Sequence, residues 1–167
     1  MPSSHYEPIF YSMCLKAAVP TFPLMQDLKQ SVEKKEIKNI DFICYSQKKI
    51  YLIDVKGTNT LSGDTKISDN DINALKTLTE IYGKNAVPLI VYVWTKPKLD
   101  YIEIDDLLLQ RFRIKAIDMN SFEKNVKWSG SWAKGSSTKY HRCDKNLLKN
   151  IWEYIPNFSS LITYTKS

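Results

Sequence analysis

The chain has 167 residues, of which 43% are hydrophobic and 25% charged, and its formal net charge is +6. This composition is ordinary for one globular domain and excludes fibrous and disordered classes. The longest apolar stretch, 86–94, is too short to span a bilayer, and the N-terminus lacks a secretory signal pattern. Three cysteines form no disulfide framework. We expect a single domain over 1–167, intracellular, in the cytoplasm or associated with a nucleoid or nucleus, with reduced thiols.

The first third of the chain predicts two helices and then a β-hairpin. Ser3 or Ser4 can cap a first helix that continues to about Ala18. A second helix is expected from about Pro23, with one apolar face made by Leu24, Met25, Leu28 and Val32. Segments 40–45 and 50–56 are rich in β-branched and aromatic residues and are separated by a polar break. They predict the two strands of the hairpin.

The turn of this hairpin decides which of its residues face each other. If it centres between Gln47 and Lys48, facing residue numbers add up to 95, and Asp41 faces Asp54. A four-residue loop keeps this sum, whereas a loop with an odd number of residues does not. Because side chains alternate along a strand, Asp41, Asp54 and Lys56 then share one face.

Two carboxylates placed in this way repel each other, so something is expected to compensate. Like charges directly opposite destabilise a sheet, and Mg²⁺ is a cation that prefers carboxylate and carbonyl oxygens. Lys56 adds an ammonium on the same face. We interpret Asp41, Asp54 and Lys56 as a site for phosphate chemistry; the alternative is that they are solvated residues at strand ends. His5 and His141 have no zinc-site spacing, and no glycine-rich phosphate loop is present.

The middle of the chain predicts a strand–helix–strand unit. A polar loop is expected over 57–66, followed by a helix that Ser68 caps and Gly83 ends. The continuous apolar segment 86–94 predicts a central strand. This order of elements predicts a right-handed parallel crossover. Further expected elements are strands at 101–104 and 113–117, a helical turn over 105–109, and a last helix from about Asp144 with the apolar stripe Leu147, Leu148, Ile151, Trp152 and Ile155.

All of the formal positive excess lies in the segment 124–149. This segment has seven basic residues and one acid, whereas the rest of the chain has 17 of each. Cations neutralise phosphates, and aromatic rings stack on exposed bases. The alternative is a solvated loop whose tryptophans pack on the domain. The predicted nucleic-acid-binding residues are Lys127, Trp128, Trp132, Lys134, Lys139, Tyr140 and Arg142.

Asp41, a twelve-residue gap and then Asp54-Val55-Lys56 at the end of a hairpin strand resemble the motif of the PD-(D/E)xK nuclease superfamily. The segments TKISDNDINALKTLTEIYG, VPLIVYVW and YIEIDDLLL are similar to the helix, core strand and following strand of resolvase-like members, archaeal Holliday-junction resolvases among them. Ile40 stands where the family usually has proline, and Asp54 where glutamate is more common. The resemblance covers roughly 40–109. It implies a restriction-endonuclease-like α/β fold, with a mixed central β-sheet flanked by helices over about 1–120 and a basic C-terminal extension over 121–167.

The resemblance also implies residue roles. Asp41, Asp54 and the backbone carbonyl of Val55 would bind Mg²⁺ or Mn²⁺, and Lys56 would orient the attacking water or help to deprotonate it. The implied activity is metal-dependent hydrolysis of DNA phosphodiester bonds by an endonuclease of restriction, repair or junction-resolving type, acting alone or as a homodimer. The alternatives are a catalytically inactive nucleic-acid-binding module of the same fold, and an interaction protein in which the two acids do not meet.

Many members of the superfamily add an acid from the first helix. Glu7 is the candidate here, with Glu33 and Glu36 as rivals, although Glu7 is equally well explained as a helix-start residue. Polar residues on the later helix that approach the site in some members would map near Asn73 or Lys76.

Overall fold

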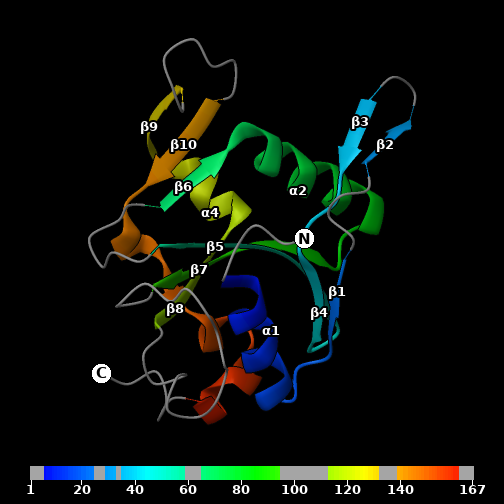
Figure 1. Cartoon of the computed structure of the whole chain (residues 1–167), viewed down its shortest axis with the longest axis vertical. Helices are drawn as coiled ribbons and strands as arrows, with labels where there is room; N and C mark the ends of the chain where they lie inside the picture. The colour runs from blue at the N-terminus through cyan, green and yellow to red at the C-terminus, as the bar shows by residue number, and fades with distance from the viewer. Residues whose placement is uncertain are drawn as a thin grey trace.

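The centre of the computed structural model, which describes residues 6–24, 29–32, 35–58, 65–94, 113–131 and 139–161, is a six-stranded mixed sheet (Figure 1). Its strands, in spatial order, are β1 (Thr21–Pro23), β4 (Phe42–Ser46), β5 (Lys49–Thr58), β7 (Ala86–Trp94), β8 (Arg113–Asp118) and β11 (Lys149–Asn150). Strands β5 and β7 are parallel, and the other neighbours in this sheet are antiparallel. The expected mixed α/β fold is therefore confirmed.

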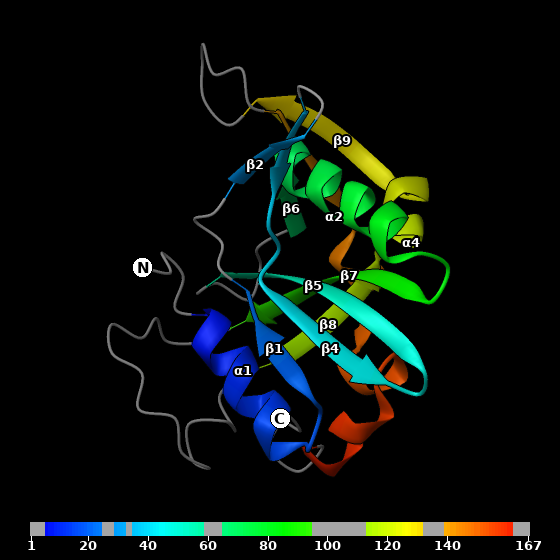
Figure 2. The ribbon, with the colours of Figure 1, turned by 90° about the vertical axis from the view of Figure 1, so that its right-hand side faces the viewer.

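Helical elements cover both faces of this sheet (Figure 2). Helix α1 (Tyr6–Lys16) and the 3₁₀ segments η2 (Ile151–Glu153) and η3 (Pro156–Leu161) pack on one face and bury what we call the α1-side core. Helices α2 (Asp69–Tyr82) and α4 (Met119–Lys124) pack on the other face and bury the α2-side core. Strand β5 lies between β4 and β7 and contributes side chains to both cores.

The predicted hairpin and its register are confirmed from Phe42 to Ser46 on β4 and from 49 to 53 on β5, and the predicted pair of Asp41 with Asp54 lies beyond the paired residues. Ser46 pairs with Lys49 and Phe42 with Ile53, so facing residue numbers add up to 95. The turn residues Gln47 and Lys48 both have positive φ, 50° and 63°, as in a two-residue type I′ turn. Neither residue favours this conformation, so the packing of the two strands, and not the turn sequence, determines the register.

The predicted parallel crossover is also present. After β5 the chain passes through β6 (Thr65–Ser68) and α2 and returns in β7, parallel to β5. Ser68 caps α2 by accepting a hydrogen bond from the backbone N–H of Asp71, and Gly83, with a φ of 91°, ends the helix. The expected loop over 57–66 is wrong at both of its ends. β5 extends to Thr58 because it keeps pairing with β7, and Thr65 and Lys66 pair with β10.

The helix expected from about Pro23 is wrong. Residues 21–23 form the edge strand β1, and the following described residues form the hairpin of β2 (Lys29–Val32) and β3 (Lys35–Lys38). Apolar spacing alone fits a helix here, but the open edge of β4 provides backbone partners for an extended chain. Pro23, which cannot donate a hydrogen bond, is tolerated at the end of an edge strand.

The long helix expected from about Asp144 is also wrong. This region forms η1 (Lys145–Leu147), the short strand β11, and then η2 and η3. Leu148 packs in the α2-side core, whereas Ile151 and Ile155 pack in the α1-side core. A single straight helix cannot reach both faces of the sheet, so the chain crosses the edge of β8 in an extended conformation. The strand expected at 113–117 is confirmed as β8, and the elements expected over 101–109 lie outside the described residues.

The basic segment 124–149 contains two strands, whereas a solvated loop was one of the two interpretations of its sequence. β9 (Val126–Ser131) and β10 (Lys139–Cys143) join β6 in a three-stranded antiparallel sheet with the order β6–β10–β9. The three cysteines are free thiols, and all are buried. Within the parts of the chain described above, no helix is long and apolar enough to cross a membrane.

Candidate active site

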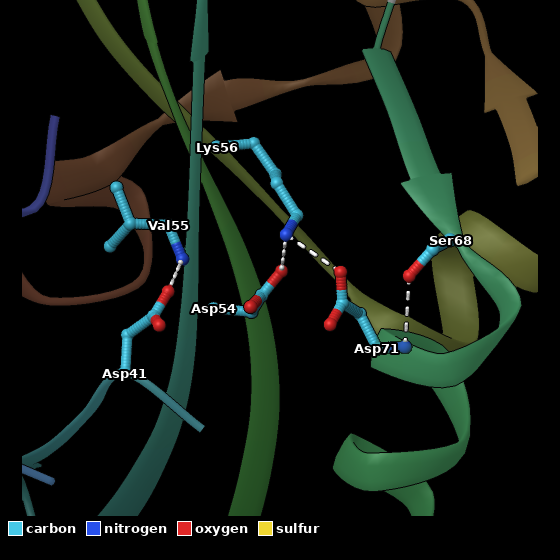
Figure 3. A network of polar contacts seen from close by, with 6 residues as sticks. All are labelled: Asp41, Asp54, Val55, Lys56, Ser68 and Asp71. Carbon is cyan, nitrogen blue, oxygen red and sulfur yellow. Dashed lines mark hydrogen bonds and ion pairs between the residues drawn. The ribbon is translucent and has the colours of Figure 1, made fainter. Parts of the chain in front are cut away.

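Asp41 lies immediately before β4, at the point where the pairing of β4 with β5 ends. Its backbone N–H donates to the carbonyl of Ile53 at 3.1 Å. Its carboxylate Oδ2 accepts a hydrogen bond of 2.6 Å from the backbone N–H of Val55 (Figure 3). The side chain thus replaces the carbonyl that a longer β4 would have offered to β5. As a result Asp41 is held in place at the end of the ladder and is only 7% exposed.

The same contact defines the direction of a backbone oxygen of β5. In an antiparallel ladder the N–H and the C=O of one residue point toward the same neighbouring strand. Because the N–H of Val55 points at Asp41, its carbonyl points to the same side, where β4 has ended. One carboxylate and one carbonyl oxygen are therefore directed to the same edge of β5.

The side chains of Asp54 and Lys56 lie on the face of β5 opposite to the Val55 side chain, and they point toward α2. The Nζ of Lys56 lies 3.2 Å from Oδ2 of Asp54 and 2.7 Å from Oδ2 of Asp71, which belongs to the first turn of α2 (Figure 3). Both acids are buried, at 5% and 7% exposed, whereas the Lys56 side chain is 29% exposed. Lys56 therefore links the end of β5 to the start of α2, with its ammonium at the border of the solvent.

Burial raises the pKa of both acids of the motif. It raises the pKa of Asp41 to about 6, against the opposing hydrogen bond from Val55, and the pKa of Asp54 to about 7, against the opposing charge of Lys56. For Lys56, burial by itself would lower the pKa, but the charges of Asp54 and Asp71 outweigh it and raise the pKa well above its ordinary value. At neutral pH the site therefore has a permanent ammonium and two carboxylates that ionise at a cost.

The oxygen atoms of this cluster fit a hard divalent cation. Oδ2 of Asp54 is buried and meets the ammonium of Lys56 at 3.2 Å in an ion pair without hydrogen-bond geometry, and carboxylate and carbonyl oxygens are the ligands that Mg²⁺ prefers. No group of three or more His, Cys, Asp or Glu side chains suited to a metal occurs among the described residues. The protein would then supply Asp41, Asp54 and the carbonyl of Val55, and Mg²⁺ ordinarily keeps several water ligands.

Helix α1 brings Glu7 to the same end of β5. Glu7 is half-buried, and its charge contributes to the raised pKa of Asp41. The helix start is held there by a close contact, because a Cβ added to Gly57 would collide with the ring of Tyr6. Among the rival acids, Glu33 and the side chain of Glu36 lie outside the described residues.

The residue of α2 that reaches the site is Asp71. Asn73 contacts Asp69 and Lys76 pairs with Glu123, and both Asn73 and Lys76 are exposed. In the sequence, Asp71 is one of the acids that follow Ser68 at a helix start, where acids are common because of the helix dipole. A signal was available, since Asp71 lies four residues before the buried Leu75, and residues four apart share a helix face.

The predicted nucleic-acid-binding residues divide between strands and segments outside the described residues. Trp132 and Lys134 lie outside them, and of Lys127 and Trp128 only the backbone, in β9, is described. In β10, Lys139 is exposed, Tyr140 is 6% exposed and Arg142 is half-buried.

Comparison with known proteins supports the fold. No family model matches the sequence, and no curated protein matches it significantly. The structure is similar to that of Hjc, a Holliday junction resolvase from the archaeal hyperthermophile Archaeoglobus fulgidus, with a TM-score of 0.56 and 12% sequence identity. The match covers 89% of this chain and 96% of the resolvase chain. The two proteins therefore share a fold over nearly their whole lengths.

Proposed function

We propose that this protein is a metal-dependent DNA nuclease that hydrolyses phosphodiester bonds, as an endonuclease of junction-resolving type. The observation that carries the proposal is the buried carboxylate of Asp54, whose Oδ2 forms an ion pair of 3.2 Å with the ammonium of Lys56. A site that keeps a carboxylate and a cation together in a buried position is suited to bind a metal ion and a phosphate. The shared fold with a Holliday junction resolvase supports this reading.

Asp41, Asp54 and the Val55 carbonyl would hold Mg²⁺ or Mn²⁺, and Glu7 would add its charge near Asp41 and would not be a third side-chain ligand in this arrangement of the described residues. When bound, the cation supplies a Lewis acid for the scissile phosphate and lowers the pKa of a bound water. Asp41 is fixed in position by its hydrogen bond to Val55. The backbone at the end of β5 thus positions the Asp41 carboxylate.

Lys56 would act through its charge. Its pKa is raised by Asp54 and Asp71, so at neutral pH it keeps its proton and is not a general base. A fixed ammonium at this position stabilises the negative charge that increases on the phosphate in the transition state. Of the two roles implied for Lys56, we therefore propose orientation and charge stabilisation.

The test is cleavage of supercoiled, linear, single-stranded and four-way-junction DNA, with Mg²⁺ or with EDTA. We expect Mg²⁺-dependent products with the junction, and none with Asp54→Asn or Lys56→Gln. Lys84→Gln is a matched control, because Lys84 is exposed and lies before β7, at the opposite end of the parallel pair from Lys56. Unchanged cleavage by the Asp54→Asn, Lys56→Gln double variant would contradict the site. Binding without any cleavage by the wild type would favour an inactive DNA-binding module.

A further inference from the structure

Lys56 has two buried acidic partners, and its contacts with them differ. Its Nζ donates a hydrogen bond of 2.7 Å to Oδ2 of Asp71. Its contact with Oδ2 of Asp54, at 3.2 Å, is an ion pair without hydrogen-bond geometry. Hydrogen bonds between charged groups are the strong polar contacts in proteins. Lys56 is therefore held mainly from α2, and its contact with Asp54 is the easier of the two to give up (Figure 3).

Burial distinguishes Asp71 from the other acid in the first turn of α2. An acid that only complements the helix dipole can remain in water, and the side chain of Asp69 is 48% exposed. The side chain of Asp71 is 9% exposed, and a buried charge needs a partner of opposite charge. Lys56 is such a partner, so the position of Asp71 serves the contact with Lys56.

The place of Asp71 is determined by contacts outside the motif on β5. Its backbone N–H donates to Oγ of Ser68, the cap of α2. One helical turn later, Leu75 is fully buried in the α2-side core. The cap and the core contact hold the first turn of α2 against the sheet. The Asp71 carboxylate therefore does not depend on Asp54 for its position.

Asp54 has two tasks that conflict in the proposed site. It is a proposed metal ligand, and an ammonium 3.2 Å from its Oδ2 competes with a metal ion for the same oxygen. The same ammonium is needed near the phosphate for its charge. Asp71 removes the conflict by offering Lys56 another carboxylate. Among the described residues no three acidic side chains are grouped to hold one ion, so this carboxylate lies outside the ligand set.

We propose that Asp71 is a positioning residue of the metal site, which holds Lys56 while Asp54 exchanges the ammonium for a divalent cation. Cation and ammonium can then occupy the site together. Without Asp71, Lys56 would pair with Asp54, and the cation would have to displace the ammonium from its own ligand. The inference rests on the proposed function for the presence of a metal ion, and it gives Asp71 an effect on metal affinity that acts through Lys56.

The experiment measures binding of Mn²⁺ in the absence of DNA, at one pH, from the electron paramagnetic resonance signal of the unbound ion. We expect Asp71→Asn to weaken the affinity by about 10- to 100-fold, the usual effect of removing an outer partner of a metal site. In the Lys56→Gln background the same substitution should have an effect smaller by more than about twofold, which is the scatter expected for independent sites. Asp69→Asn is the matched control, because it removes the same charge from an exposed position in the same turn, and it should bind Mn²⁺ within about twofold of the wild type.

Two results of this double-variant comparison contradict the inference. An equal loss of affinity in both backgrounds would show that Asp71 acts by its charge alone, and a larger loss in the Lys56→Gln background would make Asp71 a metal ligand. A wild type that binds no Mn²⁺ overturns the inference as well. Thermal unfolding without metal establishes that each variant is folded, and Asp71→Ala, which leaves no buried amide, must give the same pattern as Asp71→Asn.

Cleavage of DNA is scored separately from metal binding. Cleavage by the wild type together with equal losses in the two backgrounds would reject the role of Asp71 alone. A loss of Mn²⁺ affinity that depends on Lys56, without any cleavage by the wild type, would reject the nuclease proposal alone.

Discussion

Replacing Asp54 with Asn should stabilise the metal-free protein at about pH 8. Burial raises the pKa of this carboxyl from 3.8 to about 7, so the folded state binds its proton more tightly than the unfolded state does. The stability linked to that proton is fully present below about pH 4 and is lost as the pH rises through about 7. At about 1.4 kcal/mol for each pH unit, the ionised carboxylate costs the folded state about 4 kcal/mol.

Asn removes this charge but leaves a buried amide that needs partners, at a cost of about 1 to 3 kcal/mol. Lys56 also loses one of its two acids, although it keeps Asp71 at 2.7 Å. The expected net gain is about 1 to 3 kcal/mol at pH 8. At about pH 4, where the wild-type carboxyl is protonated, the gain should vanish and the variant should be equal to or less stable than the wild type.

The assay is denaturant unfolding in EDTA at both pH values, with the slope against denaturant used to verify that the unfolded states are comparable. Glu80→Gln, at an exposed position of α2, is the control for removing one negative charge and should show no such pH dependence. The quantity to compare is the stability of Asp54→Asn minus that of the wild type. If this difference is no larger at about pH 8 than at about pH 4, ionised Asp54 does not destabilise the folded protein.

Three further predictions concern the same end of β5. Mg²⁺ should raise the melting temperature at about pH 8 and lose this effect below about pH 5, because protons compete for Asp41, whose pKa is about 6; a Mg²⁺ effect that is equal at both pH values contradicts competition at these acids. Gly57→Ala should lower the free energy of unfolding by about 1 to 3 kcal/mol, because the added methyl group collides with Tyr6. The Tyr6→Ala, Gly57→Ala double variant must recover part of this loss relative to Gly57→Ala. Asp71→Asn should reduce Mg²⁺-dependent cleavage, because it removes the carboxylate that holds Nζ of Lys56 at 2.7 Å, whereas a cleavage rate equal to that of the wild type would show that Asp71 does not position Lys56.

The sequence was sufficient for the existence of the hairpin that carries the site, because β-branched strands and a polar break agreed. The pairing sum of 95 depended on a loop with an even number of residues, which the turn sequence does not specify, and β5, α2 and β7 followed from periodicity and capping. What it did not specify was the final contact of Asp41. In place of facing Asp54 across a continued ladder, Asp41 ends the ladder and binds the N–H of Val55.

The incorrect elements share one physical cause. Residues 21–23 and 149–150 are extended because the edges of β4 and β8 offer them hydrogen-bond partners, and such partners are remote in sequence. The apolar stripe from Leu148 to Ile155 has helical spacing but is divided between the two cores. Asp71 was missed for a related reason, since its significance comes from Lys56, which lies on a different element.

The contact between Tyr6 and Gly57 has a consequence for how the protein matures during synthesis. It joins the first helix to a strand made about fifty residues later, and that strand is paired on its other side with β7, which is completed only at Trp94. Chain segments fold in the order in which they leave the ribosome, but contacts between distant segments must wait for the later partner. We expect a nascent chain to hold α1 without a docking surface until β5 and β7 emerge, so that Glu7, Asp41 and Asp54 meet only after more than half of the protein has been made.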